Sequence, residues 1–261
     1  MAKVLKRSRL QIWGDVIFAL FVREIRSSFN DKFGLSWAVI NPVAFIFILS
    51  FIRGRMDGGE THSMPTFVFM AYGMLIIQMF LSMWGSTSSS IRKNRSLFAF
   101  RQVQPISAFL ATGLFELLLK ASVFLTILII MYFLQMEVKI ADPLELLFCF
   151  TQVSIVAFSL GVLFGLAEQY VKELGKLKSL IQRPMFFISG TFFSLQDVPK
   201  EYWPYLNWNP VLNGIELARQ AAYPSYGAVG VSNFYLGAST LILLSLALFC
   251  YQACWKQAIS R

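Results

Sequence analysis

The strongest constraint on this chain is a series of apolar segments, most of them long enough to cross a lipid bilayer. A membrane-spanning helix needs about 20 mainly apolar residues, because the hydrocarbon core is about 30 Å thick. Charged or turn residues bound six such segments, at residues 33–52, 66–88, 106–136, 143–167, 180–195 and 232–255. We therefore predict an all-α polytopic membrane protein with six transmembrane helices.

The composition supports a membrane protein over a soluble one. Hydrophobic residues make up 56% of the chain and charged residues 14%, whereas soluble domains contain about 25% charged residues. The net charge of +9 is also typical of nucleic-acid-binding proteins, but cytoplasmic Lys and Arg of a membrane protein explain it more simply. The three cysteines lie in apolar segments without a C-x-x-C pair and indicate no redox compartment.

Residues 1–32 are basic and predict a cytoplasmic amphipathic helix that lies in the membrane interface ahead of the first span. Four apolar residues share one face of this helix: Trp13, Ile17, Leu20 and Phe21. The apolar run at 16–22 has the length of a signal-peptide core. However, it continues directly into Arg23 with no small-residue cleavage site, so we expect the segment to be retained.

The positions of Lys and Arg predict the orientation of the chain. Of the 23 such residues, 17 lie in segments that the predicted spans place on the same side of the membrane as the N-terminus. Five lie in segments on the other side of the membrane. The remaining one, Lys120, lies within the third span. Because Lys and Arg are enriched in cytoplasmic loops, we expect both termini to be cytoplasmic.

The fifth apolar segment differs from the others. Residues 180–195 reach only about 24 Å as a helix, and they include Pro184 and Gly190. They lead into residues 196–226, which are aromatic, moderately polar and broken by prolines. Irregular backbone at membrane depth persists only where protein or a water-filled cavity satisfies its polar groups. We therefore predict a re-entrant gate, and the positions of Lys and Arg place it on the extracytoplasmic side.

The gate is expected to contain two short helices, at 199–206 and at 210–223, the second started by Asn209 before a proline. Its aromatic residues are Tyr202, Trp203, Tyr205 and Trp208. These rings either line a carbohydrate path or form an interfacial belt. Glu216 and Arg219 lie three residues apart and pair either at the surface or in the gate.

Residues 89–105 form the longest predicted cytoplasmic loop between spans. Its candidate docking residues combine positive charge with apolar side chains: Arg92, Arg95, Leu97, Phe98, Phe100 and Arg101. Two interpretations are open, namely a solvated basic loop and a short amphipathic helix that docks into a groove of another protein. We favour docking, because exposed apolar residues need a partner or lipid.

Two further patterns lie inside predicted spans. Glu116 and Lys120 are four apart in the third span, in the order that favours an ion pair. Intramembrane charges are functional candidates, but a self-neutralising pair near the cytoplasmic end is the favoured interpretation here. In the fourth span, Ala157, Gly161 and Gly165 recur every four residues and predict close packing against another helix.

The chain lacks the motifs of several other classes of protein. The Gly175-Lys176 pair is followed by Leu177 and has no glycine at the matching upstream position, so it is not a phosphate-binding loop. The sequence contains a single histidine, His62, so it can form neither an H-E-x-x-H site nor a histidine-based metal cluster. We therefore expect no catalytic residues, no metal and no cofactor on this chain, and an energy source in a second protein.

Together these features resemble a known family. The motifs that carry the resemblance are Arg23-Glu-Ile-Arg26, Phe33-Gly34, Asn41-Pro42, Phe187-Ile-Ser-Gly-Thr-Phe-Phe193 and Trp208-Asn-Pro-Val-Leu-Asn-Gly-Ile-Glu-Leu-Ala-Arg219. Over nearly its whole length the chain resembles the permease subunits of bacterial ABC exporters for polysaccharide, most of all those for capsular polysaccharide.

The resemblance implies a homodimer of permeases in the bacterial inner membrane, bound to two cytoplasmic ATPase subunits that carry ATP and Mg²⁺. The exported substrate would be a lipid-linked polysaccharide, and a periplasmic adaptor and an outer-membrane exporter would be further partners. On this analogy, residues 1–261 form one permease domain. Its parts are the amphipathic N-terminus at 1–32, the loop at 89–105 with a coupling helix within 91–104, and the periplasmic gate at 196–226.

Three alternatives stay open. An exporter of O-antigen or teichoic-acid polymers has the same architecture. A membrane-embedded glycosyl- or acyltransferase needs convergent acids, bases or a metal site, and the predicted outer face offers only scattered candidates. A homo-oligomeric channel or an ion-driven transporter would differ by working without ATP hydrolysis.

Overall fold

The structure is a computed structural model that describes residues 8–29, 34–56, 58–100, 102–136 and 139–260. Its α-helices are α1 (Arg9–Phe29), α2 (Gly34–Met56), α3 (Thr66–Lys93), α4 (Pro105–Phe133), α5 (Pro143–Tyr170), α6 (Leu174–Ile188), α7 (Trp203–Leu206), α8 (Pro210–Ala222) and α9 (Asn233–Ser260). The 3-10 helices are η1 (Arg95–Ala99), η2 (Leu195–Asp197), η3 (Lys200–Tyr202) and η4 (Pro224–Tyr226). One small antiparallel hairpin joins β1 (Glu60–Thr61) to β2 (Met64–Pro65).

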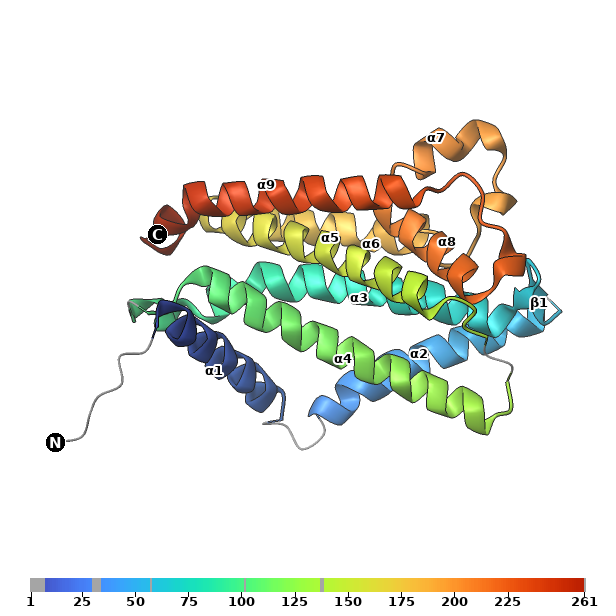
Figure 1. Cartoon of the computed structure of the whole chain (residues 1–261), viewed down its shortest axis with the longest axis horizontal. Coiled ribbons are helices and arrows are strands. Elements are labelled where there is room, and N and C mark those ends of the chain that lie inside the picture. The colour runs from blue at the N-terminus through green and yellow to red at the C-terminus, as the bar shows by residue number, and fades with distance from the viewer. Residues whose placement is uncertain (1–7, 30–33, 57, 101, 137–138, 261) are drawn as a thin grey trace.

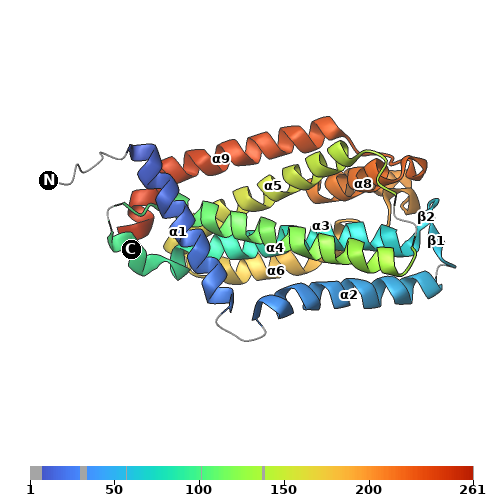
Figure 2. The ribbon, with the colours of Figure 1, turned by 60° about the horizontal axis from the view of Figure 1, so that its bottom comes forward.

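The long helices run along the long axis of the molecule, as Figure 1 shows for α2, α3, α4, α5 and α9. One end of the bundle carries α1 and the last turns of α9, and we name it the α1 end. The other end carries β1, α7 and α8, and we name it the α8 end. In Figure 2, α1 crosses obliquely over the start of α4, against which it packs.

Among the described residues, five helices are long and apolar enough to cross a membrane: α2, α3, α4, α5 and α9. They match five of the six predicted segments, with ends that differ by a few residues. The prediction of an all-helical, polytopic membrane protein is therefore confirmed.

The predicted fifth segment, 180–195, corresponds to α6, which is displaced toward the N-terminus. This helix begins at Leu174 and ends at Ile188 after 15 residues, a length of roughly 22 Å. The chain then turns at Gly190, whose φ of +73° is a left-handed conformation that glycine adopts without steric cost. As a helix, α6 alone is therefore shorter than the hydrocarbon core.

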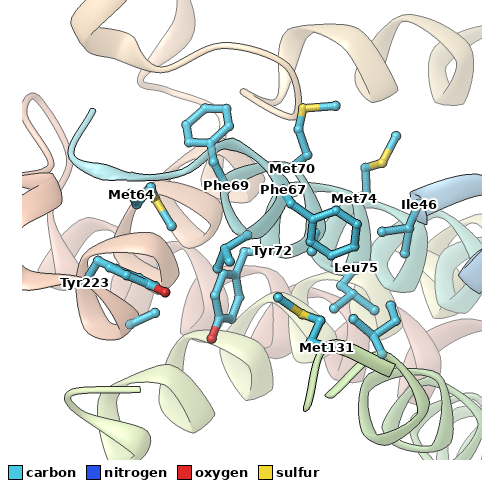
Figure 3. Packing of buried hydrophobic residues seen from close by; sticks show 14 of the residues in the cluster. Ile46, Met64, Phe67, Phe69, Met70, Tyr72, Met74, Leu75, Met131 and Tyr223 are labelled. Carbon is cyan, nitrogen blue, oxygen red and sulfur yellow. The ribbon is translucent and has the colours of Figure 1, made fainter. Parts of the chain in front are cut away.

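The central helix of the bundle is α3, which packs against α2, α4, α5 and α8. Most of its side chains are buried, including those on opposite faces, and a helix that is apolar on all sides is stable only when other elements surround it. Figure 3 shows part of its contacts, made by Tyr72, Met74 and Leu75 of α3 with Ile46 of α2, Met131 of α4 and Tyr223.

Small residues of α5 allow it to approach α3 closely. A Cβ atom added to Gly161 would lie 2.5 Å from Thr87 Cβ, and one added to Gly165 would lie 2.9 Å from Ser88 O. Both distances are shorter than a van der Waals contact, and the second is to backbone, which cannot rotate away. Ala157, one turn earlier, is fully buried in the same region of the bundle.

Candidate functional site

At the α8 end, a buried ion pair forms within α8. Glu216 and Arg219 lie about one turn apart, so their side chains leave neighbouring positions of the helix surface. Arg219 Nη1 lies 3.2 Å from Glu216 Oε1, and both side chains are fully buried. The two predicted gate residues therefore pair in the interior of the protein and not at its surface.

Arg219 also joins parts of the chain that are far apart in sequence. Its Nε donates to Phe69 O of α3 at 3.2 Å, its Nη1 to Phe193 O at 3.3 Å and its Nη2 to Thr191 O at 3.1 Å. The guanidinium carbon lies 3.5 Å from the centre of the Phe69 ring. Gly73 makes room for this arrangement, since a Cβ there would lie 2.6 Å from Arg219 Nη2. Arg219 thereby fixes α8 to α3 and to the segment after α6.

The carboxylate of Glu216 is satisfied on both oxygens. Its Oε2 accepts a hydrogen bond from Ser194 Oγ at 3.1 Å and lies 2.8 Å from the Tyr226 hydroxyl, which is also 2.7 Å from Ser194 Oγ. Burial raises the pKa of Glu216, and the Arg219 guanidinium and the hydrogen bonds oppose that rise. Glu216 and Arg219 therefore form a buried network at the α8 end in which each of the two charges has a partner.

The four aromatic residues predicted for the gate differ in exposure. Three of them lie at the surface: Tyr202, Tyr205 and Trp208. Trp203 is half-buried, its Nε1 donates to Val198 O at 2.8 Å, and its ring lies against Gly230. Trp203 therefore holds the α7 segment in place, whereas the other three rings are free to contact lipid or a passing molecule.

Asn209 connects the segment after α6 to the start of α8. Its Oδ1 accepts a hydrogen bond from Val211 N at 3.0 Å, which caps the helix, and its Nδ2 donates to Ser189 Oγ at 3.0 Å. The carbonyl of the preceding Trp208 accepts a hydrogen bond from the Tyr235 hydroxyl of α9. Hydrogen bonds to α9 and to the segment after α6 therefore hold in place the segment that carries the exposed rings.

At the α1 end, the turn between α3 and α4 is built more tightly than the amphipathic helix expected within 91–104. The first part of that range continues α3 to Lys93, and Asn94 closes the helix with its Nδ2 donating to Ser90 O at 2.8 Å. Among the described residues of that range, only the five of η1 form a further helical turn. The predicted helix is therefore reduced to a single 3-10 segment.

The two phenylalanines of this turn have opposite environments. Phe98 is only 9% exposed and packs in a cluster with Leu20 of α1, Ile91 of α3 and Phe109 of α4. Phe100 is 63% exposed. Phe98 therefore anchors the turn in the bundle, and Phe100 is the apolar side chain that a partner could contact.

The remaining predicted docking residues surround these two. Arg92 and Arg95 are exposed, and Leu97 is half-buried against the same cluster as Phe98. Arg101 lies outside the described residues. The exposed part of the turn is thus basic, with one large apolar side chain.

Direct contacts between α1 and this turn were not among the predicted site residues. Arg23 Nη1 donates to Asn94 Oδ1 at 2.8 Å, and Arg23 Nη2 donates to Lys93 O at 3.4 Å. Glu24 Oε1 accepts from Thr112 Oγ1 of α4 at 3.3 Å. The only signal in the sequence was the motif Arg23 to Arg26, which gives no information about the partner 71 residues away.

Glu116 and Lys120 do not form the predicted ion pair. Within the described residues, neither side chain has an oppositely charged partner within 4.0 Å. Glu116 Oε1 instead accepts a hydrogen bond from Ser86 Oγ of α3 at 2.5 Å. The other carboxylate oxygen, Oε2, is buried without a hydrogen-bond partner in the described part of the chain, and Glu116 acts on Lys120 only electrostatically, from beyond 4.0 Å.

A second buried ion pair was not predicted. Lys178 Nζ of α6 lies 2.7 Å from Glu168 Oε1 of α5 and also donates to Ser88 Oγ of α3. This pair ties α6 to both helices at the α1 end. The feature of the sequence that could have indicated this pair is Glu168, a carboxylate near the end of an apolar span, with Lys178 ten residues later.

These observations define a class of protein, a polytopic membrane protein with a basic exposed turn at one end and a buried polar network at the other. The family model described as ABC-2 type transporter matches residues 15–223, which is most of the chain. The chain therefore belongs to the ABC-2 type transporter family.

Individual relatives cover nearly the whole chain. It is 31% identical over 247 residues to the polysialic acid transport protein KpsM of Escherichia coli, with 94% of this chain and 96% of the relative covered. It is 26% identical to the capsule polysaccharide export inner-membrane protein BexB of Haemophilus influenzae, with 93% and 92% covered. For the corresponding protein CtrC of Neisseria meningitidis serogroup B the values are 25% identity, 92% and 91%.

The family membership and these relatives establish three properties. The chain is a transport permease subunit and not an enzyme. It is a multi-pass protein of the inner membrane. It works together with an ATP-binding subunit, as the ABC-2 transporter family implies.

Proposed function

We propose that this chain moves a lipid-linked capsular polysaccharide from the cytoplasm across the inner membrane, driven by ATP and Mg²⁺ bound to the partner subunit. The observation that carries the proposal is the 31% identity, over 94% of this chain, to a polysialic acid transport protein. Two further relatives, named as capsule polysaccharide export proteins, support the same substrate class.

In this proposal the α1 end faces the cytoplasm, as do both termini. Its support is the charge of that end, where Arg23, Arg92, Arg95 and Lys176 lie, because Lys and Arg are enriched on the cytoplasmic side. This chain then forms a homodimer, and the exposed turn around η1 in each protomer binds one copy of the ATP-binding subunit. Phe100 is the apolar contact in each turn.

The α8 end then faces the periplasm. There α6 and the segment that follows it form the sixth crossing, and the residues from η2 to α8 form a re-entrant gate within a single permease domain. The polymer passes between the two protomers, past the exposed rings of α7, toward a periplasmic adaptor and an outer-membrane exporter. The buried network of Arg219 supports this arrangement, because it gives the gate a rigid connection to the central helix α3.

Surface polymer in a capsulated host tests this function and the role of the gate. Expression of the chain and its ATP-binding subunit is expected to restore surface polymer in a host whose own permease is deleted. Tyr205→Ala is expected to lower that export about tenfold, which corresponds to a lost contact of about 1.4 kcal/mol between the exposed ring and the polymer, without disturbing the fold. Trp203→Ala should lower both export and stability, since its ring and Nε1 hold the α7 segment.

A matched control is Tyr132→Ala, because Tyr132 is 80% exposed at the α8 end of α4 while Tyr205 is 74% exposed. Export should be unchanged in that variant. Normal export in Tyr205→Ala would mean that the rings form an interfacial belt and that the path lies elsewhere. No surface polymer with the unaltered chain, despite a folded complex, would contradict the proposed substrate.

A further inference from the structure

A groove lies between four helices at the middle of the bundle. It has a volume of about 610 Å³ and is open on one side, and it is lined by residues of α2, α3, α4 and α6. Its polar residues are Asn41, Gln78, Ser82 and Lys120, and its aromatic residues are Trp37, Phe45 and Phe186. A neighbouring hollow of about 520 Å³ shares Leu81 and Phe186 with it and contains Arg183.

Lys120 lies near the middle of the spanning helix α4. It is 15 residues from Pro105 at one end of α4 and 13 residues from Phe133 at the other, which corresponds to about 22 Å and about 20 Å along the helix. Its side chain is 93% buried in the protein but lines the groove. A charged residue in such a position is costly and is expected to pair with an opposite charge or to face a polar path.

Within the described residues, no carboxylate lies within 4.0 Å of the Lys120 ammonium. Three cations are buried there, and two have a carboxylate within 4.0 Å: Lys178 with Glu168, and Arg219 with Glu216. Lys120 has no hydrogen bond and no ion pair in this part of the chain. Glu116, one turn earlier on α4, acts on Lys120 electrostatically from beyond 4.0 Å, and one of its oxygens accepts a hydrogen bond from Ser86 of α3. The ammonium of Lys120 is therefore left to a group that enters the groove.

We propose that Lys120 binds an anionic group of the exported molecule, either a carboxylate of an acidic sugar or a phosphate of the lipid anchor. This proposal rests on the proposed function, because it assigns the charge of the transported substrate. The groove fits such a ligand. Its amide and hydroxyl side chains can bond to sugar hydroxyls, and its aromatic rings offer apolar faces for sugar rings or for an acyl chain.

Binding of three probes to the purified permease–ATPase complex in lipid nanodiscs tests the anion site. The first probe is an oligomer of sialic acid, which has carboxylates but no phosphate. The second is lysophosphatidylglycerol, which has a phosphate but no sugar, and the third is an uncharged dextran oligomer of equal length. The variants are Lys120→Met, Lys120→Gln and Lys120→Arg, with Lys256→Met as a control that removes an exposed cation.

Lys120→Met and Lys120→Gln are expected to weaken binding of one anionic probe about tenfold or more, because a charge-assisted hydrogen bond is lost. The probe that is affected identifies the source of the anion. Lys120→Arg should stay within about threefold of the original affinity, because it keeps the positive charge. Dextran binding, and all binding to Lys256→Met, should not change.

Equal affinity of the anionic probes for the unaltered complex and for the two neutral variants would overturn the proposal, as would no binding of either anionic probe. The neutral glutamine variant retains a polar side chain, so it keeps the test valid if methionine impairs folding. Surface polymer measured on the same variants separates this proposal from the proposed function. Normal export by all of the variants would contradict only the proposed anion site. No export by the unaltered chain would contradict the proposed function itself.

Discussion

Replacement of Arg219 by methionine is expected to lower the free energy of unfolding by about 3–5 kcal/mol, because it leaves the Glu216 carboxylate buried without its cation. The same change removes the donors to the carbonyl oxygens of Phe69, Thr191 and Phe193. These bonds hold α8 to α3 and to the segment after α6. We therefore expect the α8 end to lose its order first and export to be abolished.

Chemical unfolding of the purified permease in detergent micelles measures this effect. Arg219→Lys should recover only part of the stability, because an ammonium cannot present the planar fork that reaches four acceptors. Glu216→Leu combined with Arg219→Met should be more stable than Arg219→Met alone, since no buried charge is left unpaired. The control is Lys200→Met, which removes an exposed cation at the same end. Equal stability of Arg219→Met and Lys200→Met would contradict the structural role of the network.

Replacement of Phe100 by aspartate is expected to weaken the complex with the ATP-binding subunit about 30-fold or more, which is the effect of losing a central contact residue of an interface. Phe100 is the large apolar side chain of this turn that is exposed, and Arg92 and Arg95 lie near it in sequence. An aspartate would remove the apolar contact and reduce the positive charge of the surface. Co-purification and a titration of the ATP-binding subunit against the permease in nanodiscs measure the loss.

Phe98 is unsuitable for this test, because its burial between α1, α3 and α4 means that a charge there would destabilise the permease itself. Tyr205→Asp is a better control, since it changes an aromatic residue of similar exposure at the opposite end. That variant should bind the ATP-binding subunit normally. If Phe100→Asp also bound it normally, the docking surface would have to lie elsewhere on the α1 end.

The spanning helices could be predicted from the sequence because their signal is local. A run of apolar residues of the right length specifies a membrane helix without knowledge of what it packs against. The short helices of the α8 end were predictable for a related reason, since Pro199 and Pro210 mark helix starts. The structure begins η3 at Lys200 and α8 at Pro210.

Contacts between distant segments could not be predicted in this way. The spacing of Glu116 and Lys120 allows an ion pair, but Ser86 on another helix bonds to the carboxylate instead. The spacing of Glu216 and Arg219 allows the same geometry, and there the pair forms on one carboxylate oxygen while Ser194 and Tyr226 bond to the other. Helical periodicity therefore says which side chains can meet, and the tertiary packing decides which of them do.

The exposure of individual side chains in the docking turn was equally hidden. Phe98 and Phe100 are two residues apart and chemically identical, yet one is buried and the other exposed. Residues two apart lie on roughly opposite faces of an α-helix, so helical periodicity does not say which of the two is buried. The packing of α1, α3 and α4 around Phe98 decides it. The contacts of Arg23 with the same turn likewise depend on where α1 crosses α4.

The most direct test of the account is whether export by this permease requires ATP hydrolysis by a separate subunit. The chain is expressed in a capsule-producing host that lacks its own permease, together with an ATP-binding subunit that binds but does not hydrolyse ATP. Surface polymer is then compared with that of cells containing the active subunit. The account predicts that the inactive subunit still co-purifies with the permease and that surface polymer is lost. Polymer export that persists without hydrolysis would contradict it and would identify the chain as a channel or an ion-driven transporter.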